Sequence, residues 1–328
     1  MTVEWSDDPR TFTARDWSSL VEADPEATVF HTPDYLKLYW EEFGAERLLL
    51  GFVGIGGDDV AAAAFDVRDG TAAWLGGFDV TDYMGPVGRP EERDEAAKEL
   101  LVGLAGRDDW QDADLAGLPA RSSWLPSLRR AAESAGLAHD VEDDDVAPYL
   151  RLPRTFEEYL AALPGKLRHE IRRKDRRLRE AYPDVRLVDA TPSTLPHDLD
   201  RFFEMHRSSR GEKGRFMAPH MELFFRRLAD ELLPEGRFRL ALLEAGGTKM
   251  AAAVGFRDRN RFLLYNSAFD ERYRAVSPGM VLVLELIRSA IEEGRRGFDF
   301  LKGDLPYKYR YGARGRRIVR LRLRREAR

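Results

Sequence analysis

Residues 261–312 read RFLLYNSAFDERYRAVSPGMVLVLELIRSAIEEGRRGFDFLKGDLPYKYRYG. This stretch predicts a strand over residues 261–268, a loop over 270–276 and a strongly apolar helix over 278–293 that ends at Gly294. A second strand is predicted over residues 297–301, where the run Gly-Phe-Asp-Phe-Leu follows the helix. Strands and helices therefore follow one another closely, which indicates a mixed α/β fold.

The same order of elements occurs in the first half of the chain. When the sequence is placed over itself at a constant shift of 190 residues, Gly56-Gly57 falls on Gly246-Gly247, and the alanines at 61–63 fall on those at 251–253. Each half reads as a helix, a three-strand meander, a second helix and a further strand, which predicts a duplicated fold. The other expected elements are strands at 146–152, 185–188 and 318–323, and helices at 127–135, 156–163, 165–181 and 199–207.

Length and composition exclude several classes of protein. A chain of 328 residues with 43% apolar residues suggests two domains with real cores rather than a disordered chain. The absence of cysteine excludes a disulfide framework, a zinc ribbon and a cysteine nucleophile. No apolar run reaches the roughly 18 residues that a membrane helix needs, and the first ten residues do not resemble a signal peptide. A cytoplasmic location is therefore expected.

The net charge of −5 hides a strong difference between the two halves. Residues 1–150 carry a net charge of −20, and residues 151–328 carry +15. Two interpretations follow. Opposite charges attract across a domain interface and keep the protein soluble, or the basic half binds an anionic ligand.

Two stretches of the second half are especially basic. Residues 166–179 contain eight Lys or Arg, and residues 314–328 contain eight Arg. The first stretch has a narrow apolar stripe of Leu167, Ile171 and Leu178, which predicts a helix docked along one edge. The second alternates apolar residues with arginine, which predicts a half-buried edge strand. A phosphate-rich partner such as tRNA would also suit both stretches.

The beginning of the predicted helix at 278 is a candidate anion site. Serine at 277 is a suitable N-cap, Pro278 is tolerated in the first turn, and Gly279 allows a ligand to approach the backbone. The free N–H groups and the dipole of such a helix end favour a phosphate or pyrophosphate, and Arg272 and Arg274 would add charge. The alternative is an ordinary capped helix, since the chain contains neither a GxGxxG nor a GxxxxGK[ST] motif.

The loop after the strand at 297–301 is the second candidate for chemistry. Lys308 would stabilise negative charge that develops on a carbonyl oxygen, Tyr307 would donate a proton, and Asp304 would act as a base or hold an acceptor amine. The alternative is a polar loop whose tyrosines are half-buried against the sheet. No metal is expected, because the six histidines do not have the spacing of metal ligands. His206 and Arg207 border either an acceptor pocket or a mobile surface loop at 208–214.

These features together resemble the GNAT acyltransferase superfamily, in particular its FemAB-like and CelD-like branch of tandem GNAT domains. The resemblance is carried by Ser277-Pro278-Gly279-Met280 before an apolar helix, Phe298-Asp299-Phe300-x-x-Gly303-Asp304-x-x-Tyr307-Lys308-x-Arg310-x-Gly312, Lys166-x-Arg168-x-x-Ile171-Arg172-Arg173-Lys174 and Phe30-x-Thr32-Pro33-x-Tyr35. It implies two tandem GNAT-like domains of the α/β (α+β) class, at 1–152 and 153–328. Each would be a mixed, mostly antiparallel sheet flanked by helices.

The resemblance also implies a donor and a site. In GNAT domains acyl-CoA binds between two splayed parallel strands, which here are 261–268 and 297–301. The matching residues for acetyl-CoA or another acyl-CoA are Asn266, Ser267, Ala268, Phe269, Arg274, Ser277, Pro278, Gly279 and Met280. The lysine thought to neutralise the acyl oxyanion in FemAB-like enzymes maps onto Lys308. The usual Q/R-x-x-G-x-G/A signature is partly present, with Ser277 in place of the first glycine, which leaves room for a different acyl carrier.

The resulting hypothesis is an N-acyltransferase. The basic second domain moves an acyl group to an amine by direct attack, and the acidic first domain is non-catalytic. The acceptor would be a small molecule or a precursor of the cell envelope or of a polysaccharide. One alternative is a FemAB-like aminoacyltransferase that takes its acyl group from aminoacyl-tRNA for cell-envelope synthesis. The other is a non-catalytic tandem module that binds a polysaccharide or a protein.

Overall fold

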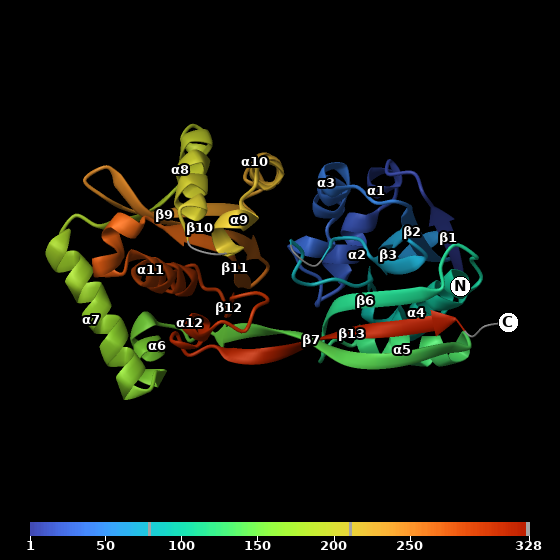
Figure 1. The fold of residues 1–328 in the computed structure, drawn as a ribbon. Helices are drawn as coiled ribbons and strands as arrows, with labels where there is room; N and C mark the ends of the chain where they lie inside the picture. The colour runs from blue at the N-terminus through green and yellow to red at the C-terminus, as the bar shows by residue number, and fades with distance from the viewer. Residues whose placement is uncertain (78–79, 210–211, 326–328) are drawn as a thin grey trace. The chain divides into compact units, whose positions relative to one another are not determined.

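The computed structural model describes residues 1–77, 80–209 and 212–325 and divides the chain into two compact units (Figure 1). The first unit is Met1–Val146 together with the segment from Arg316 onward, and the second is Ala147–Gly315. The division falls inside two long strands, β7 (Leu137–Arg151) and β13 (Arg314–Arg325). It therefore differs from the single predicted boundary at 152/153, since the last strand supplies apolar side chains to the core of the first unit.

The sheet of the first unit has the strand order β1-β2-β3-β4-β6-β13. Only β4 and β6 pair in parallel, from Thr71 opposite Asp112 to Ala73 opposite Asp114. The strands are β1 (Thr2–Ser6), β2 (Leu48–Ile55), β3 (Asp58–Arg68), β4 (Thr71–Trp74), β5 (Val87–Gly88), which pairs with β3, and β6 (Asp112–Pro119). The helices are α1 (Thr11–Ala14), α2 (Trp17–Ala23), η1 (Val29–His31), α3 (Pro33–Phe43), η2 (Pro90–Glu92), α4 (Arg93–Ala105) and α5 (Trp124–Ser134).

The sheet of the second unit has the order β7-β12-β11-β10-β9-β8, and only β11 and β12 are parallel. The helices α8 and α10 cover one face of this sheet, and α11 with α7 covers the other (Figure 1). The strands are β8 (Arg186–Asp189), β9 (Phe238–Ala245), β10 (Thr248–Asp258), β11 (Arg261–Phe269) and β12 (Gly297–Asp299). The helices are α6 (Phe156–Ala162), α7 (Gly165–Ala181), α8 (Leu195–Arg207), α9 (Glu212–Phe216), α10 (Pro219–Leu232), η3 (Glu271–Val276), α11 (Pro278–Glu292) and α12 (Pro306–Tyr309).

Strand register shows that the two units share one plan. Val53 pairs with Ala61 next to an irregularity in the first unit, and Leu243 pairs with Ala251 next to the matching irregularity in the second. Each partner is shifted by 190 residues, as the glycine pairs predict. The parallel contacts β4–β6 and β11–β12 are also three residues long in both units. The expected fold class, two mixed and mostly antiparallel sheets flanked by helices, is confirmed.

The apolar helix α11 lies at the centre of the second core. Its buried residues include Leu282, Leu286 and Ile287, each 0% exposed, which pack on one face of the sheet. Full burial of each such side chain contributes roughly 1.5–3 kcal/mol. The helix is therefore fixed firmly, and so is the position of its first turn.

The C-terminal strand differs from its prediction as an edge strand. β13 lies between β6 and β7, and its apolar residues are buried. Its arginines form ion pairs within the first unit: Arg317 with Asp143, Arg320 with Asp114 and Asp144, Arg322 with Glu142, Arg324 with Asp112, and Arg325 with Asp108. The charge difference between the halves of the sequence is thus partly neutralised inside one unit, because the basic end of the chain returns to the acidic part.

None of the helices in the described part of the chain combines the length and the apolar character that crossing a bilayer requires.

Candidate functional site

The parallel strands of the second unit separate soon after they meet. β11 and β12 pair only from Arg261 opposite Gly297 to Leu263 opposite Asp299. β11 continues to Phe269 along β10, whereas β12 ends at Asp299. Residues 264–269 of β11 consequently have no strand partner on the β12 side among the described residues. We call this segment the open edge of β11. Its backbone N–H and C=O groups are able to pair with an extended ligand.

A strained turn drives the separation. Leu301 has a φ of 58°, a left-handed conformation that is unfavourable for a residue with a branched side chain. Its N–H donates to Oδ1 of Asp299 at 3.0 Å, and Asp299 is 0% exposed. The N–H of Phe300 donates to the carbonyl of Pro148 at 2.9 Å. The buried carboxylate and the neighbouring strand therefore hold the chain in a direction that leads away from β11.

A β-bulge lies beside this turn, in β11. Val254 pairs with Asn266 but Gly255 pairs with Leu264, so Tyr265 is the extra residue. The ring of Tyr265 packs on Phe225 of α10, and Oδ1 of Asn266 lies 3.0 Å from Nε2 of His206 on α8. Neighbouring residues 265 and 266 thus face the same side, as a bulge allows. The resemblance predicts Asn266 as a donor-binding residue. In the structure its side chain hydrogen-bonds to His206 of α8.

The other predicted residues of β11 follow the normal alternation. Ala268 is buried at 2% exposure, and Phe269 packs against the core on the α11 side. The side chain of Ser267 is half-buried. The open edge of β11 therefore presents its backbone, while the neighbouring side chains anchor the strand to both helical layers.

The N-terminal end of α11 is close to the end of the open edge. A Cβ atom added at Gly279 would lie 3.2 Å from Cδ1 of Phe269, so glycine lets the first turn approach the strand end. Pro278 has no N–H, and the carbonyl of Met280 accepts a hydrogen bond from the hydroxyl of Tyr311 at 3.1 Å. The predicted elements at 266–269 and 278–280 are thus neighbours in space.

The predicted cap at Ser277 is wrong in one respect. Ser277 has a φ of 57° and makes no side-chain cap hydrogen bond. Its hydroxyl instead accepts a hydrogen bond from Nζ of Lys174 on α7, at 2.8 Å. The left-handed conformation turns the side chain away from the helix, and a cation from another helix lies beside the N-terminal end of α11.

The arginines ahead of α11 are exposed on η3. Arg274 is 66% exposed and lies 3.5 Å from Glu271, and Arg272 is 73% exposed. Arg272 and Arg201 donate to Asp270, and the hydrogen bonds from Arg272 hold the pKa of that carboxyl well below its usual value. Arg274 is therefore exposed ahead of the N-terminal end of α11, whereas Arg272 is engaged in fixing the loop.

The late loop places Lys308 in the protein interior. Lys308 is 3% exposed, and its Nζ donates to the carbonyl oxygens of Leu301 at 2.9 Å and Lys302 at 2.6 Å. These two bonds fix the ammonium beside the strained turn. Burial of an ammonium is costly unless hydrogen bonds compensate for the lost water, and here the loop carbonyls supply them.

The other two predicted catalytic residues lie in different surroundings. Tyr307 packs against the apolar core, and burial raises its pKa to about 12. Asp304 is exposed and accepts a hydrogen bond from the hydroxyl of Tyr309. Tyr307 is therefore a phenol that keeps its proton at neutral pH, and Asp304 is a carboxylate open to solvent.

Three buried tyrosines are expected to titrate late. Burial raises the pKa of Tyr159 and Tyr311 above 10, as it does for Tyr307. In a titration followed at 295 nm, these three tyrosines should therefore ionise later in the native protein than in denatured protein, which should show all eleven tyrosines at once. Because the unfolded state loses these protons first, stability should decrease as the pH rises above about 10. A complete native step near pH 10 would contradict this assignment.

The matching position in the first unit is different. α4 begins at Arg93 and carries Asp94 as its second residue, where α11 has Gly279, in the alignment that places β6 over β12. Arg93 is 7% exposed and pairs with Asp24 at 2.6 Å and Glu26 at 3.4 Å. Internal carboxylates thus already surround this helix end, which disfavours an anionic ligand there.

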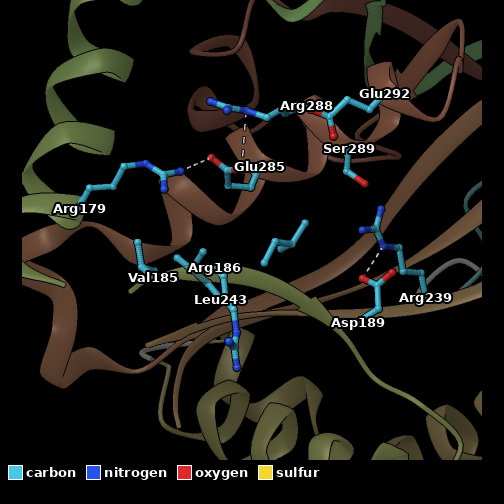
Figure 2. A pocket seen from close by; sticks show the side chains of 11 residues that line it. Arg179, Val185, Arg186, Asp189, Arg239, Leu243, Glu285, Arg288, Ser289 and Glu292 are labelled. Carbon is cyan, nitrogen blue, oxygen red and sulfur yellow. Dashed lines mark hydrogen bonds and ion pairs between the residues drawn. The ribbon is translucent and has the colours of Figure 1, made fainter. Parts of the chain in front are cut away.

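A cavity of about 540 Å³ in the second unit lies apart from these residues, by the C-terminal half of α11 (Figure 2). Its charged groups pair with one another: Arg179 with Glu285 at 2.7 Å and Arg239 with Asp189 at 2.9 Å. Burial raises the pKa of Glu285. The cavity is lined by Arg179, Val185, Arg186, Leu187, Asp189, Arg239, Leu243, Glu285, Arg288, Ser289 and Glu292. It contains none of the predicted site residues.

Several residues of the site have no clear signal in the sequence. Lys174 is one of eight basic residues in its stretch, and nothing in the sequence distinguishes it from the others. Asp299 lies in the motif that carries the GNAT resemblance, but the sequence assigns it no role. Tyr311 joins the late loop to α11 only through the fold. The sequence predicts that His206 borders either an acceptor pocket or a mobile loop at 208–214, of which residues 210–211 lie outside the described part. Its bond to Asn266 depends on the bulge at Tyr265, which the amino-acid pattern does not reveal.

Comparison with known families identifies the second unit. The model of the acetyltransferase (GNAT) domain family matches residues 165–309. This range contains the open edge of β11, all of α11 and Lys308. None of the curated proteins matches the sequence significantly.

Solved structures share the fold over nearly the whole chain. FemX is 11% identical with a TM-score of 0.69, covering 98% of this chain and 97% of its own. A conserved protein of unknown function from Bacteroides thetaiotaomicron VPI-5482 is 15% identical with a TM-score of 0.66, covering 99% and 100%. A tandem GNAT protein from the clavulanic acid biosynthesis pathway is 15% identical with a TM-score of 0.51, covering 99% and 100%. The predicted resemblance to GNAT proteins and the tandem fold are confirmed.

Proposed function

Residues 165–309 match the acetyltransferase (GNAT) domain, and from that premise we propose that the second unit moves an acyl group from acyl-CoA, such as acetyl-CoA, to an amine. The observation that carries the proposal is the open edge of β11 next to the N-terminal end of α11. An extended pantetheine arm needs free strand backbone, and a diphosphate needs free N–H groups at a helix end. Both features meet where Phe269 lies beside Gly279. The N–H groups of Met280 and Val281 donate to the carbonyl of Ser277, so the N–H of Gly279 is the group that this turn would offer to the diphosphate.

The residues around this place fit such a donor. Gly279 leaves room at the first turn, where a side chain would crowd Phe269. Lys174 and the exposed Arg274 supply positive charge beside the same turn. Backbone groups at 266–269 would pair with the pantetheine amides, in the way that an added strand pairs with an open edge.

The chemical step is a direct attack on a thioester. The nitrogen of the acceptor forms a bond to the carbonyl carbon, the C–S bond breaks, and the sulfur leaves as a thiol after taking a proton. Lys308 would neutralise charge on the carbonyl oxygen, and Tyr307, whose raised pKa keeps it protonated, would give the sulfur its proton. Asp304, which is exposed, would hold or deprotonate the incoming amine. Most of the rate gain comes from positioning, since thioesters are already reactive.

The first unit has a supporting part in this proposal. Its helix end at Arg93 is surrounded by Asp24 and Glu26, so we assign it no acyl donor. The acceptor is an amine, either a small molecule or a precursor of the cell envelope or of a polysaccharide. Because acyl-CoA is a metabolite of the cell interior, the reaction would take place in the cytoplasm.

The proposal favours a thioester over an aminoacyl-tRNA donor. An RNA partner was suggested by two basic stretches, but the arginines of β13 are paired with carboxylates. One of the two basic stretches that suggested RNA binding therefore has its charge neutralised by carboxylates of this chain. A non-catalytic module remains the alternative, and it predicts that no thioester is bound or consumed.

Binding of acetyl-CoA tests the proposal. At a ligand concentration of 100 times Kd, we expect stabilisation by about 2.7 kcal/mol, which thermal unfolding would show as a raised Tm. Gly279→Asp should weaken binding at least tenfold in calorimetry, because it places a carboxylate where the diphosphate would lie. It also copies the aspartate that α4 already has at this position.

Two further variants make the result specific. Gly279→Ala adds only the Cβ atom and should weaken binding much less than Gly279→Asp, which separates charge from crowding. Asp94→Gly in the first unit should leave acetyl-CoA binding unchanged. No stabilisation by acetyl-CoA, longer acyl-CoAs or free CoA would contradict the proposal, and equal losses in Gly279→Ala and Gly279→Asp would remove the diphosphate from this helix end.

A further inference from the structure

One surface of the second unit carries positive charge that the fold does not use. The outer face of α7 consists of the exposed residues Lys166, His169, Arg172, Arg173, Arg176 and Arg177. Arg176 lies 3.6 Å from Glu180, and no other ion pair joins the arginines and the lysine of this face to the described residues. At 1.5 Å per residue the face is about 17 Å long.

The opposite side of α7 makes the contacts that hold the helix. Ile171 and Leu178 are buried at 3% and 0% exposure. Two of the three acidic residues of the helix also lie on the inner side: Glu170 lies 3.8 Å from Arg310, and Asp175 lies 2.9 Å from Arg179. The third, Glu180, is exposed and pairs with Arg176. The helix therefore docks through its apolar stripe and its inner ion pairs, without help from the outer face.

The outer face lowers the stability of its own helix. Arg172 and Arg176, and likewise Arg173 and Arg177, are four residues apart and repel each other by a few tenths of a kcal/mol per pair. A double row of arginine that repels itself, and whose one ion pair in the described part of the chain is that of Arg176 with Glu180, is explained by a partner with negative charge.

The composition and size of the outer face favour a protein over a nucleic acid. The face has no Phe, Tyr or Trp on which a base could stack. The second basic stretch, β13, pairs its arginines with carboxylates, so it does not extend the track. A single row of acidic side chains about three helical turns long would match the outer face by itself.

The outer face is next to the proposed donor site. α7 packs on α11 and η3, and Lys174, on the inner side of α7, donates to Ser277 at the N-terminal end of α11. A protein bound on the outer face would therefore lie beside the place where a thioester arm enters. Ser277 also replaces the first glycine of the usual diphosphate signature, and one lysine beside it suits a single phosphate.

We infer that the outer face of α7 docks a small acidic carrier protein that presents the acyl group on a phosphopantetheine thioester. The inference rests on the proposed function and names a class of donor for the same site. The arm of such a carrier has the same pantetheine and thioester as acyl-CoA, with one phosphate in place of the diphosphate. The bonds that form and break are those given above, and the carrier leaves with a free thiol.

The test uses the full chain and an acetylated bacterial acyl carrier protein with a fluorescent label, and measures Kd by anisotropy. Arg173→Glu/Arg177→Glu should weaken binding at least tenfold. The matched control is Arg121→Glu/Arg129→Glu, which changes the net charge equally at exposed arginines of the first unit and should stay within twofold of wild type. Both variants should bind acetyl-CoA as wild type does, and the Arg173/Arg177 variant should keep its Tm, because both side chains are exposed and one like-charged pair replaces another.

The outcomes separate this inference from the proposed function. Loss of carrier binding in the Arg173/Arg177 variant with unchanged acetyl-CoA binding supports the inference. Weaker binding of the apo carrier, which lacks the arm, than of the acetylated carrier to wild type also supports it. Equal binding of the carrier to wild type and to this variant overturns it. Wild type could instead bind total tRNA, or vesicles containing phosphatidylglycerol, more tightly than it binds the carrier, and lose this binding in the Arg173/Arg177 variant. That result would also overturn the inference. Failure of acetyl-CoA itself to bind would instead contradict the proposed function.

Discussion

A chain that ends at Gly315 is expected to lose the folded structure of its first unit. The deletion removes the part of β13 that lies between β6 and β7. Ile318, Val319, Leu321 and Leu323 of this strand are between 0% and 2% exposed. Burial of each such side chain contributes roughly 1.5–3 kcal/mol, and four of them together approach the 5–15 kcal/mol that typically stabilises a whole domain.

Charge adds to the expected loss. Nη2 of Arg320 lies 2.8 Å from Oδ1 of Asp144, whose side chain is 1% exposed. Without β13 this carboxylate and its neighbours Glu142 and Asp143 would each lose an arginine partner. Removal of one partner of a buried ion pair is strongly destabilising, because it leaves an uncompensated charge.

Tryptophan fluorescence measures this effect directly. All six tryptophans, Trp5, Trp17, Trp40, Trp74, Trp110 and Trp124, belong to the first unit. The chain that ends at Gly315 should therefore show a red-shifted emission like that of denatured protein. A chain that ends at Arg325 is the matched control, since it keeps all of β13, and it should emit like wild type. Native emission from the shorter chain would show that β13 is dispensable for this unit.

Replacement of Lys308 by methionine is expected to lower turnover of acetyl-CoA about 10²–10³-fold. This is the usual cost of removing one group that stabilises an oxyanion. Methionine keeps the apolar length of the side chain but donates no hydrogen bond to Leu301 or Lys302. Release of thiol from acetyl-CoA in the presence of a set of primary amines would measure the loss.

Because Lys308 also anchors a turn, the test needs a second measurement. If the ammonium acts on the reacting carbonyl, kcat should fall while Kd for acetyl-CoA changes less than threefold. If it only fixes the strained turn at Leu301, Tm and acetyl-CoA affinity should fall and kcat should be nearly retained. Lys302→Met changes the neighbouring lysine and should have little effect on either quantity. The second pattern would assign Lys308 a positioning role.

The sequence by itself determined the duplicated plan of the fold. Turn glycines at 56–57 and 246–247, together with the periodic apolar residues between them and the next helix, are local signals that act within one element or one hairpin. The same is true of α11, whose apolar residues and Pro278 mark a helix beginning without any tertiary contact. These signals placed the strand at 261–268 and the beginning of the helix at 278 correctly.

Only the tertiary structure decided which distant residues meet. The sequence of the basic C-terminal strand predicts a half-buried edge strand, but its partners Asp112 and Asp144 are some 180–210 residues away in sequence. Likewise the bond from Lys174 to Ser277, and that between His206 and Asn266, join elements that no short-range pattern connects. Charge and apolarity in a sequence show that a side chain needs a partner. The partner itself is chosen by packing of the whole unit, since many carboxylates and hydroxyls could satisfy the same arginine or lysine.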